Sequence, residues 1–188
     1  MKIKNKNKNK GFTFLEVMVT ISVIAILSSI GLVSLTSSKS VTRLKNAQSE
    51  VAATIKMAQS YALQGKKPTS GTACGYGFQF TGSGTYRIYY NPLNTSLFSD
   101  CNAQNLDVGY RHNIVSSQEV EPLSLPAGVM LKSPAFAVTG IFFDVPHANA
   151  YSSSGANFGG FTLVFGLSGS GSDERTITVS SKASLTLN

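Results

Sequence analysis

The feature that most constrains the fold is a run of 22 residues, positions 17–38, without a charged side chain. As an α-helix, residues 12–38 would span about 40 Å, which is enough to cross a bilayer. The run is rich in β-branched residues, but lipid enforces a helix because backbone polar groups there must bond within the segment. The sequence therefore predicts a transmembrane helix that cannot belong to a soluble core.

Five lysines stand at alternate positions from 2 to 10, directly before this run. Positive charge holds that end of an apolar helix in the cytoplasm. We therefore expect a single-pass protein of the inner (cytoplasmic) membrane whose C-terminal domain lies outside the cytoplasm. Without residues 1–11, 16 basic and 9 acidic side chains become 11 and 9, so the formal charge falls from +7 to +2.

A single carboxylate, Glu16, stands at the start of the apolar run, and a carboxylate in lipid is costly enough to need a reason. The sequence KGFTFLE, residues 10–16, resembles the class III signal of type IV pilins and pseudopilins. The resemblance implies cleavage after Gly11 by a prepilin peptidase and methylation of the new amine of Phe12. It also implies that Glu16 acts in assembly, with other pilin subunits and an assembly platform as partners.

The spacing of these groups is physically consistent with that role. An amine at Phe12 and a carboxylate at Glu16 lie about 6 Å apart along a helix axis. A neighbouring subunit, staggered along the filament, can then pair its amine with this carboxylate. The competing interpretation is a glutamate that reaches to the membrane interface.

Beyond the membrane segment the helix is expected to continue, and to end near Gln64. Side chains that are apolar, except for one glutamine, recur at steps of three and four. Gly65 and Pro68 then favour the end of the helix. This stripe predicts packing against the chain's own domain, with a short coiled coil as the alternative. Its members are Val41, Leu44, Gln48, Val51, Ile55, Ala58 and Ala62.

After Pro68 the pattern changes to short apolar or aromatic runs between Gly, Ser and Asn. This pattern predicts strands, with hairpin turns at 82–84 and 168–173 and a long loop at 146–160. The expected fold is α+β, a long N-terminal helix packed on a mostly antiparallel β domain. The predicted strands are 76–80, 86–90, 108–115, 129–131, 141–145, 161–165, 176–180 and 184–187.

The order of these elements resembles the GspH/FimT-type minor pseudopilins. We therefore expect a cleaved leader at 1–11, a transmembrane and filament-core helix at 12–38, its extramembrane continuation at 39–67 and a β-rich domain at 68–188. The resemblance implies a structural subunit of a type IV pilus or of a type II secretion pseudopilus. It leaves open which of these two filaments the subunit would join.

The only two cysteines, Cys74 and Cys101, both follow the membrane segment. In an oxidising compartment they are expected to form a disulfide. The alternative is two separate buried thiols.

Other chemistry has little support in the sequence. Two histidines, His112 and His147, are too few for a His-rich metal cluster, and neither a nucleophile elbow nor a P-loop occurs. We expect no enzyme, no cofactor, no metal and no small-molecule substrate. Residues 67–188 carry six basic and seven acidic side chains, which argues against nucleic acid. Two alternatives stay open: a DNA-uptake pilin, and a membrane-anchored β-domain that binds a ligand outside any filament.

Overall fold

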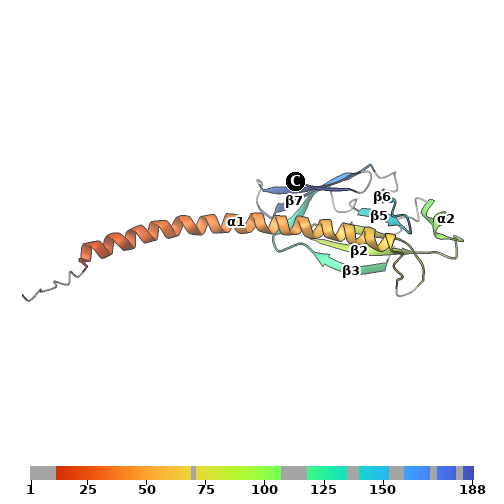
Figure 1. The fold of residues 1–188 in the computed structure, drawn as a ribbon, viewed down its shortest axis with the longest axis horizontal. Helices are drawn as coiled ribbons and strands as arrows, with labels where there is room; N and C mark the ends of the chain where they lie inside the picture. Colours follow the sequence, from red (N-terminus) through yellow and green to blue (C-terminus); the bar gives the residue numbers. More distant parts are fainter. Residues whose placement is uncertain are drawn as a thin grey trace, which may run out of the picture. The chain divides into compact units, whose positions relative to one another are not determined.

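The computed structural model describes residues 12–68, 71–106, 118–134, 140–152, 159–169, 173–180 and 184–188. Two compact units divide at Ser40 and Val41. The first helix, α1, covers Phe14–Leu63 and so contributes residues to both units (Figure 1). The α+β class predicted from the sequence is confirmed.

The second unit holds two antiparallel sheets. Sheet A has the strand order β3-β2-β1-β5-β6, and sheet B has the order β4-β7-β8-β9. Sheet A contains β1 Ala73–Phe80, β2 Thr85–Pro92, β3 Gln118–Ser124, β5 Gly140–Asp144 and β6 Ala150–Ser152. Sheet B contains β4 Val129–Ser133, β7 Phe161–Leu167, β8 Glu174–Val179 and β9 Leu185–Leu187. A short helix, α2, covers Cys101–Leu106.

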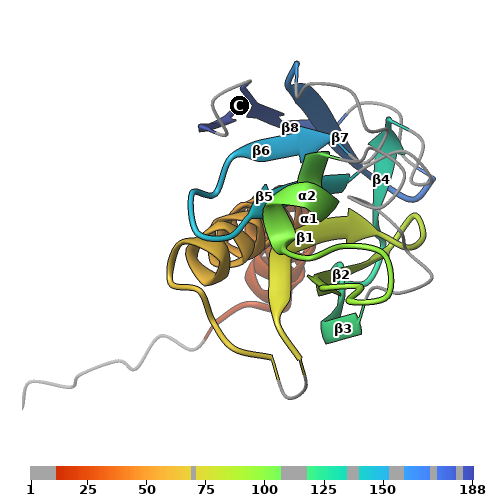
Figure 2. The same ribbon diagram turned by 90° about the vertical axis from the view of Figure 1, so that its right-hand side faces the viewer.

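The C-terminal part of α1 packs on both sheets. Six of the seven positions in the predicted stripe are buried, and only Val41 is partly exposed. The stripe joins one core with aromatic and aliphatic side chains of β1, β2, β5, β7 and β8. Both views place sheet B and the β2–β3 edge of sheet A along different sides of this part of α1 (Figure 1, Figure 2). The prediction that the stripe packs on the chain's own domain is therefore confirmed.

Gln48 is the polar member of the buried stripe. Its Nε2 donates hydrogen bonds to the backbone carbonyls of Thr176, at 2.7 Å, and Asn188, at 3.0 Å. Because a buried amide must find partners, these bonds turn a polar position into a link between α1 and the β8–β9 pair.

The helix ends where the sequence predicts, and Gly65 is the reason. Gly65 has φ +57°, the left-handed conformation that glycine adopts without strain. Its N–H donates to the carbonyl of Ala62 at 3.2 Å, and Lys66 N–H donates to that of Tyr61 at 3.1 Å. These two bonds form a Schellman motif, which satisfies carbonyls that the helix end leaves open.

Most predicted strands are found, with bounds shifted by a few residues, but three elements were missed. The predicted strand 108–115 lies outside the described residues. β6 lies inside the predicted loop 146–160, where Tyr151 pairs with Phe142 of β5. β3 was not predicted because its sequence, QEVEPLS, does not alternate between apolar and polar residues. A strand at the edge of a sheet tolerates charged residues and proline. α2 is too short to show a helical period.

The central strands β1 and β5 of sheet A are buried on both faces, and most of β2 is buried too, although the residues of the predicted strand 86–90 fit a strand with only one buried face. Tyr86, Ile88 and Tyr90 face α1, and Tyr89 on the opposite face is also buried. The ring of Tyr89 lies over Gly77, where an added Cβ would come within 2.2 Å of the ring. Phe142 covers Gly75 in the same way. Glycines therefore alternate with aromatics along β1 because large rings need the space above them.

This contact predicts the effect of Gly77→Ala. The new methyl group would collide with the buried Tyr89 ring, so that the ring or the strand would have to shift. We expect a loss of about 1–3 kcal/mol in the free energy of unfolding, measured by denaturant unfolding of the full chain in detergent. Gly84→Ala is the matched control, since a Cβ added there would lie 3.9 Å from its nearest neighbour. Equal stabilities of the two variants would contradict this explanation of the glycines in β1.

Candidate processing and assembly site

The N-terminal end of α1 is fixed by a capping residue. Thr13 Oγ1 accepts a hydrogen bond from Glu16 N–H at 3.3 Å, and the carbonyl of Thr13 accepts one from Val17 N–H at 3.2 Å. Thr13 and Glu16 have the spacing of a capping box, in which the side chain at the N-cap satisfies an open backbone donor. The sequence-based prediction did not include Thr13, although the T-x-x-E pattern could have revealed it.

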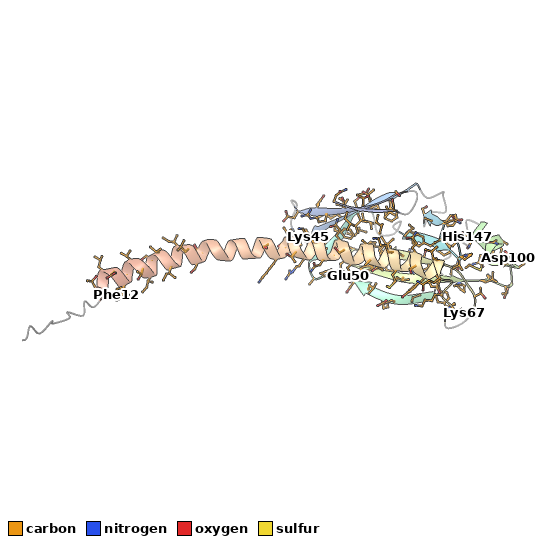
Figure 3. All side chains as sticks on the ribbon, in the orientation of Figure 1. Phe12, Lys45, Glu50, Lys67, Asp100 and His147 are labelled. Carbon is orange, nitrogen blue, oxygen red and sulfur yellow. A yellow bond between two sulfur atoms is a disulfide. The ribbon has the colours of Figure 1, made fainter. Side chains whose placement is uncertain are left out.

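Glu16 therefore lies in the first turn of α1, where a negative charge is favourable near the positive end of the helix dipole. Its side chain is exposed and forms no ion pair with any residue that the structure describes. Phe12, two residues before the first residue of α1, is 81% exposed (Figure 3). Gly11 and the rest of the leader lie outside the described residues.

The apolar side chains that follow Glu16 have no partner within the described part of the first unit. Large hydrophobic side chains on all sides of the helix are exposed, from Phe14 to Leu27. A helix that is apolar all round requires lipid or other helices to cover it. Three hydroxyls in this segment donate to backbone carbonyls of the preceding turn: Thr20 to Val17, Ser22 to Met18 and Ser29 to Ile26. Such bonds satisfy polar groups without water.

In the part of the chain that the structure describes, no helix meets both the length and the hydropathy required to cross a membrane.

The two cysteines lie on the other unit and form a disulfide, as predicted. Cys74 on β1 is bonded to Cys101 at the start of α2. Asp100 caps this helix by accepting from Ala103 N–H at 2.9 Å. Asn105 then donates to the carbonyl of Cys74 at 3.0 Å. The disulfide and these bonds hold α2 against β1.

Glu50, a charged residue on the exposed part of α1, contacts Tyr86 of β2. Glu50 accepts a hydrogen bond from the hydroxyl of Tyr86 at 3.0 Å. Burial raises the pKa of Tyr86, and the bond to Glu50 and its charge raise it further. The hydroxyl therefore stays protonated and keeps donating to the Glu50 carboxylate.

The residues that could suggest catalysis are not brought together. Asp144 accepts bonds from the backbone and side-chain N–H groups of Asn149, and its Oδ2 lies 3.5 Å from the hydroxyl of Tyr151. It therefore shapes the turn before β6 instead of pairing with His147. His112 lies outside the described residues. Among the described residues, no group of three or more His, Cys, Asp or Glu side chains could hold a metal.

Comparison with known proteins addresses the N-terminal segment. The profile of the prokaryotic N-terminal methylation motif matches residues 6–32. The chain therefore carries this methylation motif near its N-terminus. The matched segment contains Gly11, Phe12 and Glu16.

Comparisons of the whole chain with known proteins show less similarity than the N-terminal segment does. No curated protein matches the chain significantly. Among solved structures, the type IV minor pilin FimU of Pseudomonas aeruginosa is similar, with a TM-score of 0.47 and 15% identity. That similarity covers 78% of this chain and 89% of the other.

The disulfide predicts a redox-dependent stability. Reduction would open a loop between cysteines that are 27 residues apart, and chain entropy assigns such a cross-link about 3.5 kcal/mol. We expect the free energy of unfolding of the full chain in detergent to fall by about this amount on reduction. The double variant Cys74→Ala/Cys101→Ala should be as unstable as the reduced chain and should not respond to the reductant. An oxidised chain that gains nothing over this variant would contradict the prediction.

Proposed function

We propose that this protein is a structural subunit of a type IV pilus or pseudopilus. The N-terminal methylation motif at residues 6–32 is the observation that carries the proposal. A prepilin peptidase would cleave after Gly11, and the amine of Phe12 would be methylated. Residues 12–38 would cross the inner membrane before assembly and then enter the core of the filament, with the β-rich domain outside the cytoplasm.

The exposed apolar surface of α1 supports this proposal. Leaving such side chains in water is unfavourable by about 25 cal/mol per Å² of apolar surface. Lipid before assembly, and the helices of other subunits after it, would each remove that cost. The same helix thus serves first as an anchor and then as a packing element.

Glu16 would set the position of each new subunit. In the chain alone, no described residue carries a positive charge next to this carboxylate. The amine of a neighbouring subunit's Phe12 supplies the missing charge. Leaving one partner of a buried ion pair without the other costs about 3–5 kcal/mol, so a subunit placed out of register would be strongly disfavoured.

The charged side chains described on sheet B do not favour DNA uptake over a structural role. On sheet B, Lys132 forms an ion pair with Glu174 at 3.3 Å, so that cation is already neutralised. Arg175 follows Asp173 and Glu174 in sequence. Phosphate binding requires several cations together. The sequence allows Arg87 and Arg111 to lie close together in space, but Arg111 lies outside the described residues.

Substitution at Gly11 tests processing. A branched side chain in Gly11→Val would obstruct the close approach of a protease to the backbone at this junction. We expect the variant to keep its leader, which is visible as an intact mass of the full chain in the membrane fraction. Asn9→Ala, in the same leader, should be cleaved like the wild type. Normal cleavage of Gly11→Val would place the processing site elsewhere.

Substitution at Glu16 separates charge pairing from helix capping. Glutamine serves a capping box as glutamate does, so Glu16→Gln keeps the helix start and removes only the charge. We expect normal cleavage but at least about a tenfold lower abundance in sheared filaments, as the loss of a buried pair implies. Thr13→Val weakens the cap and keeps the charge, so its abundance should stay near the wild-type level. If Glu16→Gln assembled normally, the carboxylate would have no role in assembly.

A further inference from the structure

The loop between β2 and α2 carries a motif that the proposed function does not use. Asn94, Thr95 and Ser96 match the pattern N-x-S/T without proline in the middle position, which is the acceptor sequence for N-linked sugars. No other asparagine in the sequence has Ser or Thr two positions later. Such a short pattern also occurs by chance, so the structure around it decides what it can do.

The loop holds this motif on the surface of the second unit. Asn94 is half-buried, whereas Thr95, Ser96 and the following Leu97 are exposed. Figure 3 labels Asp100, which ends the loop before α2, at the periphery of the second unit. An enzyme that modifies a folded chain needs an accessible segment of this kind, and surface loops supply it.

The two chemical groups of the motif are not engaged elsewhere in the described part of the chain. Neither the Nδ2 of Asn94 nor the hydroxyl of Ser96 forms a hydrogen bond with a described residue. The amide nitrogen carries two N–H groups, which are therefore available for reaction. Asn105 shows the opposite case, because it is buried and its Nδ2 donates to the carbonyl of Cys74 at 3.0 Å.

The backbone of the loop orients the motif. The Oδ1 of Asn94 accepts a hydrogen bond from Ser96 N–H at 3.1 Å, which forms an Asx turn. Asn94 N–H donates to the Oε1 of Gln104 at 2.7 Å, and its carbonyl accepts from Phe98 N–H at 3.0 Å. These bonds fix the backbone and the amide oxygen of Asn94 and leave Nδ2 as the free end. The turn also folds residue 96 back toward residue 94, so one enzyme can contact both.

The disulfide supports the loop and agrees with the compartment that this chemistry requires. Cys101 directly follows the loop and is bonded to Cys74 of β1. Disulfides of this kind persist in oxidising compartments outside the cytoplasm. N-linked sugars are likewise a modification of surface loops in exported proteins. The inference rests on the proposed function, which puts the second unit in that compartment.

We propose that Asn94 is the acceptor of an N-linked glycan. The donor is a sugar carried on a lipid diphosphate, and a transferase in the membrane brings it to the loop. Nδ2 forms a bond to the anomeric carbon of the sugar, and the bond from that carbon to the diphosphate oxygen breaks. The diphosphate leaves with the bonding electrons, and Nδ2 gives one proton to a base of the transferase. The hydroxyl of Ser96 is the group by which the transferase recognises the site.

Mass spectrometry of the full chain from the native host tests the assignment. After reduction, trypsin releases residues 88–111 as one peptide, because an arginine precedes it and another ends it. We expect this peptide to carry the added mass of a glycan, and fragmentation to place that mass on Asn94. Asn102 is a control in the same peptide, since it is exposed but has Gln104 two positions later. An unmodified peptide, or a glycan on Asn102 or on a hydroxyl group, would overturn the proposal.

Substitutions at Ser96 separate recognition from folding. Ser96→Ala keeps Asn94 and its Asx turn, since the turn uses the backbone N–H of residue 96, and removes only the hydroxyl. We expect this variant to lose the added mass, whereas Ser96→Thr keeps a hydroxyl and should retain it. Both should be recovered from the membrane in wild-type amounts, because residue 96 is exposed. A glycan on Asn94 of Ser96→Ala would show that the motif is not what the transferase reads, and the proposal would be wrong.

Failure of the modification and failure of the proposed function give different results. A wild-type chain that begins at Phe12 in sheared filaments but carries no glycan contradicts only the modification. A chain that keeps residues 1–11 and is missing from the filaments contradicts the proposed function, whatever the mass of the peptide that contains Asn94.

Discussion

The packing of one face of α1 against two sheets is the interaction on which the second unit depends. Helix residues from Leu44 to Ala62 supply one side of the core, and the aromatic faces of β1 and β2 supply another. Sheets A and B are separate hydrogen-bonded sheets that contact each other through side chains such as Phe80 and Phe165, and the helix adds its buried face to their common core. Gln48 adds a polar link to this apolar contact, because its amide reaches the backbone of both β8 and the residue after β9.

The N-terminal part of α1, in contrast, is not buried by the chain's own described residues. Its described apolar side chains are exposed on all sides, and the hydroxyl groups of Thr20, Ser22 and Ser29 bond to their own helix. One helix thus combines a segment that its own domain completes with a segment that requires lipid or other subunits. Under the proposed function, the charge of Glu16 would provide the register that apolar packing lacks.

Sequence patterns predicted the elements whose signal is local and repeated. The stripe of α1, the stop at Gly65 and the strands around Tyr76, Tyr86 and Phe161 all follow from periodicity and turn residues. β3, β6 and α2 did not, because their formation depends on tertiary partners: β3 on the edge of β2, β6 on β5, and α2 on the disulfide to Cys74. The burial of Tyr89 was missed for the same reason, since a strand sequence does not reveal that its second face is covered. At the candidate site, Gly11, Phe12 and Glu16 stood out by their spacing, whereas the Glu50–Tyr86 contact joins residues 36 positions apart and has no sequence signature.

N-terminal mass spectrometry of filaments sheared from the native host tests the central claim most directly. We expect a mature chain in that fraction that begins at Phe12 and carries a methyl group on its α-amine. A chain that keeps residues 1–11, or that is missing from the filament fraction although it is present in the membrane, would contradict the claim that this protein is a processed filament subunit.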